Sequence, residues 1–116
     1  MNAKVETTGE ARGEALDRAH LARQTSGDHA LEREVLALFA DHAASALGLI
    51  KAAEGRSGRR EAAHSLVGSA RSIGAFRVAD AAATIENGQG DSPAGIATLE
   101  AAIDEVRRLI AGYLSE

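Results

Sequence analysis

The segment that decides the fold is residues 59–77, with the sequence RREAAHSLVGSARSIGAFR. At about 100° per residue, this segment forms an amphipathic helix. Its apolar side carries Ala62, Leu66, Ser69, Ala70 and Ile73. His64 lies on the opposite side, about 180° from Ile73 by the same count. We therefore expect an imidazole that faces water, on a helix whose far side packs in a core.

Gly68 is an unusual residue for the middle of this helix. A glycine inside a helix costs about 1 kcal/mol relative to alanine, and Gly68 lies one turn beyond His64 on the same face. Because side chains tilt toward the helix N-terminus, the missing side chain leaves a gap beside the imidazole. The other neighbours on this face are Arg60, Val67 and Arg71. The pattern predicts room for another molecule's backbone, or for a bulky group carried on the ring.

This face resembles the signature of histidine-containing phosphotransfer (HPt) domains. The matching residues are the run 64–70, HSLVGSA, the run 73–75, IGA, and the later apolar–acidic pair Ile85 and Glu86. The chain departs from the family pattern at Val67, where the family commonly has a lysine that is thought to steady the phosphoryl group. The resemblance predicts an all-α fold and a carrier function for the chain.

The resemblance implies that His64 accepts a phosphoryl group on Nε2 from a receiver-domain aspartate and passes it to another receiver domain. Neutral imidazole is available as a nucleophile near pH 7, which suits this chemistry. A hybrid sensor histidine kinase is the expected source of the phosphoryl group. The receiver is expected to supply Mg²⁺ and most of the transition-state electrostatics. We expect no cofactor on this chain, and we expect it to act as a monomer.

The residues around His64 receive two expected roles. Arg60 and Arg71 are candidates for the phosphoryl environment, because a guanidinium offsets phosphoryl charge, and Gly68 leaves space there. Ser65, Val67 and Gly68 are candidates for docking the receiver, with Val67 as an apolar contact on the exposed face. The alternative for the arginines is that they are solvated surface charges, and the alternative for Val67 is that it is an isolated surface residue.

Apolar periodicity and turn residues predict helices and no strand. The expected helices span residues 14–24, 29–54, 59–73, 77–87 and a last stretch that begins after Ser92 and Pro93. Asp28 and Ser92 are the expected N-caps. The fold class is therefore all-α, an antiparallel up-down-up-down four-helix bundle with a short N-terminal capping helix. Residues 1–13 are expected to form a flexible leader, and residues 14–116 form the bundle domain.

The core-facing residues follow from the same periodicity. Two adjacent stripes on the longest helix predict a wide apolar face: Leu31, Val35, Leu38, His42, Ser45 and Leu49 in one, and Phe39, Ala43, Ala46, Ile50 and Ala53 in the other. The last helix carries an unbroken repeat of Ile96, Leu99, Ile103, Val106, Ile110 and Tyr113, the spacing of a bundle seam. Val78, Ala82 and Ile85 are the expected inward residues of the helix before it.

The composition excludes several classes of function. The net charge is −4 with a pI of about 5.6, which disfavours a nucleic-acid partner because phosphate binding needs a basic face. The chain has no cysteine, and it lacks the 18-residue apolar run of a membrane span. We expect a cytoplasmic protein with no membrane partner. No ATP-binding signature is present, so we expect a phosphoryl carrier without its own kinase activity.

The other histidines show no metal-ligand spacing. His29 is expected to be exposed, and His42 is expected to be half-buried and satisfied within the fold. Two alternatives to the carrier function remain open at this stage. The chain could be a helical module that docks to receiver domains without phosphotransfer, with Val67 marking a degenerate member. It could also be a plain structural bundle in which His64 is incidental.

Overall fold

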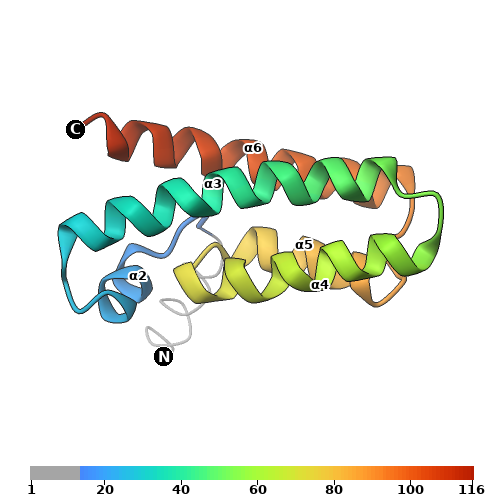
Figure 1. Ribbon diagram of the computed structural model, residues 1–116, viewed down its shortest axis with the longest axis horizontal. Helices are drawn as coiled ribbons and strands as arrows, with labels where there is room; N and C mark the ends of the chain where they lie inside the picture. Colours follow the sequence, from blue (N-terminus) through green and yellow to red (C-terminus); the bar gives the residue numbers. More distant parts are fainter. Residues whose placement is uncertain (1–13) are drawn as a thin grey trace, which may run out of the picture.

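The computed structural model describes residues 14–116, and the leader expected for residues 1–13 lies outside this part. The described residues form helices and no strand, which confirms the all-α class. The helices are α2 (Arg18–Gln24), α3 (His29–Ala52), α4 (Arg56–Ile73), α5 (Phe76–Glu86) and α6 (Pro93–Leu114) (Figure 1). Three begin at other residues than expected: α2 at Arg18, because Asp17 caps it by accepting from the His20 amide, α4 at Arg56, and α5 at Phe76.

Four long helices surround one core. α3 packs against α4 and α6, and α5 packs against the same two helices (Figure 1). The short α2 lies at one end of this arrangement and packs on α4. The expected caps are confirmed, since Asp28 accepts from the Leu31 amide, and Ser92 accepts from the Gly95 amide one residue before Pro93.

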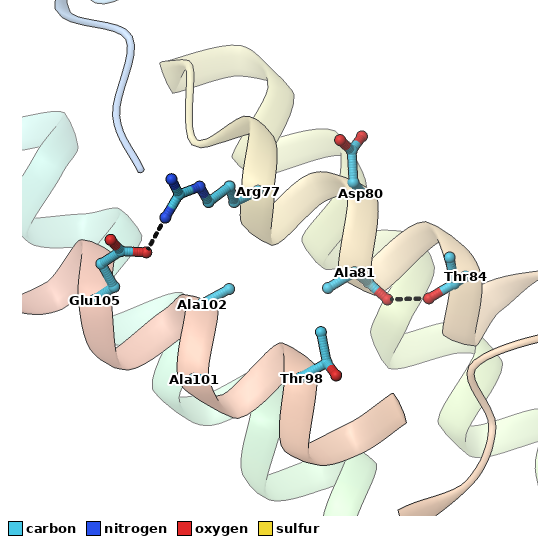
Figure 2. A pocket seen from close by; sticks show the side chains of 8 residues that line it. All are labelled: Arg77, Asp80, Ala81, Thr84, Thr98, Ala101, Ala102 and Glu105. Carbon is cyan, nitrogen blue, oxygen red and sulfur yellow. Dashed lines mark hydrogen bonds and ion pairs between the residues drawn. The ribbon is translucent and has the colours of Figure 1, made fainter. Parts of the chain in front are cut away.

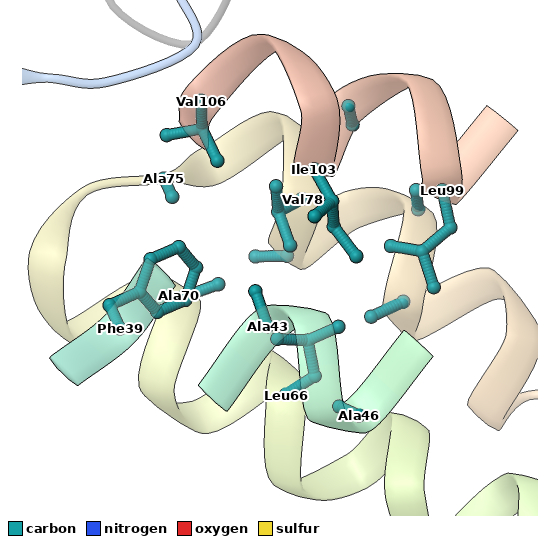
Figure 3. Close-up of a cluster of buried hydrophobic side chains, with 14 of the residues drawn as sticks. Phe39, Ala43, Ala46, Leu66, Ala70, Ala75, Val78, Leu99, Ile103 and Val106 are labelled. Carbon is teal, nitrogen blue, oxygen red and sulfur yellow. The ribbon is translucent and has the colours of Figure 1, made fainter. Parts of the chain in front are cut away.

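The core is built mainly from alanine and aliphatic side chains (Figure 3). The repeat on α6 is confirmed from Leu99 to Tyr113, and Ile96 is only partly buried. The inward residues expected on α5 are confirmed as well. The alanines let the helix axes approach closely, and fully buried larger residues from each helix fill the space between them. These include Leu21, Leu36, Ile50, Leu66, Val78, Ile85, Ile103 and Ile110.

The wide apolar face expected on α3 is wrong for one of its two stripes. The stripe of Phe39, Ala43, Ala46 and Ile50 is buried. The leucines of the other stripe lie outside the core: Leu38 and Leu49 are each 63% exposed, and Leu31 is also exposed, while Val35 is partly buried against the core. This second stripe is rotated by about 100° from the first, which carries it past the arc that α4 and α6 cover. Leu36, fully buried one turn before Phe39 and Ala40, takes its place in the core.

Gly74 makes the corner between α4 and α5. Its φ is 90°, in the left-handed region, and its amide donates to the carbonyl of Ala70 at 3.1 Å. A Cβ at this position would lie 2.8 Å from the carbonyl oxygen of Asp17, whose own amide donates to the Gly74 carbonyl. Both the backbone conformation and the close approach require glycine. The tight corner expected at Gly74 and Ala75 is therefore confirmed.

A polar cluster joins α2, α3 and α6 at the end of the bundle near α2. Glu32 is 6% exposed and accepts from the Tyr113 hydroxyl at 2.7 Å and from the Thr25 hydroxyl at 3.2 Å. Arg18 lies over the Tyr113 ring, 4.4 Å from its centroid. The burial of Glu32 is explained by two hydroxyl donors that come from separate segments of the chain.

At the opposite end, Asp91 joins the loop before α6 to the start of α4. It forms ion pairs with Arg59 and Arg56, and Arg59 also donates to the carbonyls of Ile50 (3.2 Å) and Ala53 (3.3 Å) at the end of α3. Hydrogen bonding from Arg59 lowers the pKa of the Asp91 carboxyl, partly opposed by desolvation. The Arg59 guanidinium thus connects α4 with the end of α3 and with the loop before α6.

Because the pKa of Asp91 is lower in the folded chain, the ion pair stabilises the fold above the ordinary carboxyl value of 3.8 and is lost as the pH falls below it. We expect Asp91→Asn to lower the Tm at pH 7, and the gap to wild type to shrink only as the pH falls below the ordinary carboxyl value of 3.8. Thermal melts followed by circular dichroism at pH 7 and pH 3 test this. Asp104→Asn, at an exposed carboxylate of α6, is the control. A gap of equal size at both pH values would contradict the assignment.

One described helix, α3, has the length and mean hydropathy that crossing a membrane would require. The core helices of soluble proteins satisfy the same criteria, so this is weak evidence for a membrane span. Its buried stripe packs against α4 and α6, and its exposed side carries the leucines described above. The apolar character of α3 is therefore divided between a core face and an open face.

Candidate functional site

His64 lies midway along α4 and points away from the core. Its side chain is 76% exposed, while Leu66 and Ala70 on the other side of the helix are fully buried. The expectation of an imidazole facing water is confirmed. The ring is held outward because the opposite face of α4 is fixed by packing against both α3 and α5.

Glu86, the last residue of α5, lies against the His64 ring. Its Oε2 is 2.5 Å from Nδ1 of His64, and the Glu86 side chain is 22% exposed. The corner at Gly74 explains how the two meet. His64 lies ten residues before Gly74 and Glu86 ten residues after Phe76, so at 1.5 Å per residue each is about 15 Å from the turn.

This hydrogen bond determines which ring nitrogen can react. Glu86, as a carboxylate, accepts a hydrogen bond from the protonated Nδ1, so the contact selects the tautomer in which Nε2 carries the lone pair. Within the part of the chain that the structure describes, no hydrogen bond engages Nε2 of His64. The arrangement therefore offers one free, exposed nucleophilic nitrogen whose ring is oriented by a neighbouring carboxylate.

Open space surrounds Gly68, as the sequence predicted. Gly68 is exposed, and a Cβ placed on it would meet no atom within 4 Å. The packing of this chain therefore gives no reason for glycine at this point of the helix. Ser65 is also exposed, and its Oγ lies 3.4 Å from Nε2 of His42 on α3.

The expectation that Val67 lies on the exposed face is wrong. Val67 is 6% exposed and belongs to the core cluster. At about 100° per residue, it lies next to Leu66 around the helix, on the margin that also carries Ala63. Because α4 packs against α3, α5 and the short α2, its buried arc is wide enough to include this margin. Val67 is therefore a core residue, and its side chain does not form the apolar docking contact expected from the sequence.

Arg60 and Arg71 are exposed on the His64 side of α4. Neither forms an ion pair with another described residue. No contact joins either guanidinium to His64 in the described part of the chain. Both are therefore free to interact with a group outside it, but the structure does not gather them around the ring.

The other histidines are placed apart from one another. His29 is exposed with its Nδ1 3.7 Å from Glu32 Oε1, and Nε2 of His20 lies 3.1 Å from the Ser72 carbonyl oxygen. His42 is half-buried against Ser65, as expected, but it is not fully satisfied, because only its Nε2 has a partner among the described residues. Across residues 14–116, no group of three His, Asp or Glu side chains is arranged to hold a metal ion.

A mostly apolar hollow lies between α5 and α6, away from these residues (Figure 2). Ala81, Thr98 and Ala102 line it, and the ion pair of Arg77 and Glu105, at 2.6 Å, closes one end. None of the expected site residues lines this hollow. His64 is therefore separate from this hollow.

Sequence reasoning did not assign Glu86 to the site, although it noted the apolar–acidic pair at residues 85 and 86. A usable signal was present in the spacing. His64 lies ten residues before Gly74 and Glu86 twelve residues after it, and a chain that turns back at this corner brings residues at such similar distances side by side. Applying that count to the acidic residues after Gly74 would have selected Glu86.

Comparison with known proteins finds a matching family model and a similar solved structure. A family model described as the Hpt domain matches residues 33–109. The chain is also similar to a solved structure, the histidine phosphotransferase ShpA from Caulobacter crescentus, with 32% sequence identity and a TM-score of 0.71. That match covers 86% of this chain and 90% of ShpA. Among curated proteins, none matches this sequence.

Proposed function

Because this chain belongs to the Hpt domain family, which performs histidine phosphotransfer in phosphorelay signalling, we propose that His64 is the residue that carries the phosphoryl group. The observation that supports this most strongly is the 2.5 Å contact between Nδ1 of His64 and Glu86, with the ring 76% exposed. Hpt domains interact with receiver domains and are phosphoryl carriers rather than kinases. The source and acceptor of the phosphoryl group are therefore aspartates of receiver domains.

The transfer step is a direct displacement at phosphorus. The Nε2 lone pair of His64 forms the P–N bond as the P–O bond to the receiver's aspartate breaks, and the electron pair of that bond returns to the aspartate carboxylate. Nδ1 keeps its proton, and Glu86 stabilises the positive charge that the ring acquires. The reverse sequence of bond changes delivers the phosphoryl group to a second receiver. The Mg²⁺ that neutralises phosphoryl charge belongs to the receiver.

The receiver is proposed to approach over Gly68 and Ser65. Gly68 leaves open space one turn from His64, and Ser65 leads from there toward α3. Two strongly exposed leucines of α3, Leu38 and Leu49, extend this surface with apolar area. Arg60 and Arg71, exposed and free of ion pairs within the described chain, supply positive charge on the His64 side. The phosphoryl group and an acidic receiver pocket both favour such charge.

Several further expectations are part of the proposal. The helices form an up-down-up-down antiparallel bundle, supported by the short connections at residues 53–55, 74–75 and 87–92. Residues 14–116 are the carrier domain, and it acts as a monomer in the cytoplasm without cofactor or ATP site of its own. A hybrid sensor histidine kinase provides the first receiver. These statements rest on the family and on the free, solvent-facing ring.

The function is tested by mixing the chain with a receiver domain labelled on its aspartate with ³²P. Label is expected to move to this chain within minutes, in a form that is labile in acid and stable in alkali. A second, unlabelled receiver is then expected to remove it. Failure of every tested receiver to label the chain, although they bind it, would support the non-phosphorylating docking module instead.

Glu86 provides a second prediction. Glu86→Leu removes the acceptor for Nδ1, so the ring loses its fixed orientation and tautomer, and we expect transfer to slow by about tenfold, at the lower end of the effect of such oriented partners. Glu86→Gln keeps an acceptor oxygen, and we expect it to retain more activity than Glu86→Leu. Single-turnover transfer from a labelled receiver measures both.

The matched control is Glu34→Leu, which removes an exposed carboxylate from α3. Thermal melts check that all three variants fold. Equal transfer rates for Glu86→Leu and wild type would show that the His64–Glu86 contact has no part in the reaction.

A further inference from the structure

The surface beside His64 contains one polar contact between two hollows. Both hollows lie in the seam between α3 and α4. Leu38 and Ile73 line the first, and Leu49 and Ala62 line the second. His42 borders the first hollow and Ser65 the second, and the 3.4 Å contact between them separates the two. A partner that covered this seam would meet mostly apolar side chains and this imidazole and hydroxyl.

The contact is placed next to the proposed phosphoryl acceptor. Ser65 follows His64 in the chain, and at about 100° per residue Gly68 lies between them around α4. His42 and Ser65 lie 11 and 10 residues from the ends of the connection at residues 53–55, so the two helices carry them to the same level. A receiver that reached His64 across the open space at Gly68 would therefore extend over His42.

His42 is incompletely satisfied within the fold. Its Nε2 faces Ser65, and its Nδ1 has no hydrogen-bond partner in the described chain. The ring is half-buried, while the leucines on either side of it along α3 are strongly exposed. When a partner removes water from such a ring, it must replace the lost hydrogen bond or leave a polar atom unpaired. A site built this way discriminates between partners, because only a matching group avoids that penalty.

We propose that His42, held by Ser65, is a specificity-determining residue for phosphoryl transfer, and that it selects receiver domains that present a hydrogen-bonding side chain or carbonyl at this point of the interface. The inference rests on the proposed function of His64 and on the continuity of this seam with it. His42 does not touch the reacting atoms. Its effect therefore falls on the receiver concentration that gives half-maximal transfer, and the limiting rate is unchanged.

The test compares single-turnover transfer from a set of labelled receiver domains to wild type and to His42→Leu. The receiver with the highest wild-type efficiency is the partner, and those with the lowest measurable efficiency are the non-partners. We expect His42→Leu to raise the half-saturating concentration of the partner by about tenfold, the effect of one unpaired buried group. Non-partners are expected to be unaffected or improved, since leucine adds apolar contact.

Three variants complete the design. His42→Gln keeps hydrogen-bonding atoms and is expected to retain most of the discrimination. Ser65→Ala combined with His42→Leu is expected to be no worse than either alone, because the two residues act as a pair. Asp41→Asn changes the neighbouring exposed residue, which lines the hollow toward α6, and is expected to behave as wild type.

The outcomes separate this inference from the proposed function. If wild type accepts label but the ratio of partner to non-partner efficiency is unchanged in His42→Leu, the inference is wrong and the carrier function stands. A loss that falls on the limiting rate for all receivers alike also overturns it. If wild type accepts no label from any receiver, the proposed function fails, and this inference with it.

Discussion

His64→Gln is expected to accept no phosphoryl group from a phosphorylated receiver domain, a loss of at least about 1000-fold. The amide of glutamine is not a nucleophile, and no second histidine shares a hydrogen bond with His64 in the described chain. Because the His64 side chain is 76% exposed, the substitution leaves the core intact. The variant is expected to keep the helix content of wild type and to bind receivers with similar affinity.

The measurement pairs transfer of ³²P with a binding titration for the same receiver. His29→Gln is the matched control, since it replaces another exposed histidine, whose side chain is 84% exposed, at the start of α3. It is expected to transfer as wild type does. Labelling of His64→Gln at the wild-type rate would mean that another residue carries the phosphoryl group.

Gly68→Gln is expected to slow transfer by about 100-fold while leaving the fold at least as stable as wild type. A side chain at this position would fill the open space one turn from His64 and hold the receiver's aspartate away from Nε2. Displacing reacting groups by about 1 Å is enough for an effect of this size. Glutamine also has a better helix propensity than glycine, and a Cβ at Gly68 meets no atom within 4 Å.

Gly112→Gln is the control for this variant. Gly112 is also an exposed helical glycine with open space around its Cα, but it lies on α6, which packs mainly against α3 and α5. We expect it to leave transfer unchanged. Single-turnover rates and thermal melts distinguish the two variants. Wild-type transfer by Gly68→Gln would show that this glycine does not serve partner approach.

The sequence was sufficient to predict the helical class and the surface position of His64. Periodicity identified the seam of α6, and cap residues identified the starts of α3 and α6, because these features depend on residues close together in the chain. It wrongly predicted that the leucines of the second stripe of α3 are buried and that Val67 is exposed. In both cases the periodicity showed that an apolar face exists, but how much of it is buried depends on how many neighbours cover the helix.

Glu86 and Glu32 illustrate what local sequence cannot supply. Each is an acidic residue whose partner lies far along the chain: His64 is 22 residues from Glu86, and Tyr113 is 81 residues from Glu32. Helix propensity and capping rules treat both as solvent-facing charges. Each meets its partner only because the turns between the helices determine which residues of neighbouring helices face one another. Within the site, the sequence therefore pointed to the proposed nucleophile, and the tertiary structure identified the carboxylate that contacts it.

The most direct test of the carrier mechanism is heteronuclear NMR of the ¹⁵N-histidine-labelled chain after phosphorylation by a receiver. We predict a single phosphohistidine, with ³¹P coupled to Nε2 of His64 and a proton retained on Nδ1 toward Glu86. A phosphoryl group on Nδ1, on another histidine, or on no histidine at all would contradict the account.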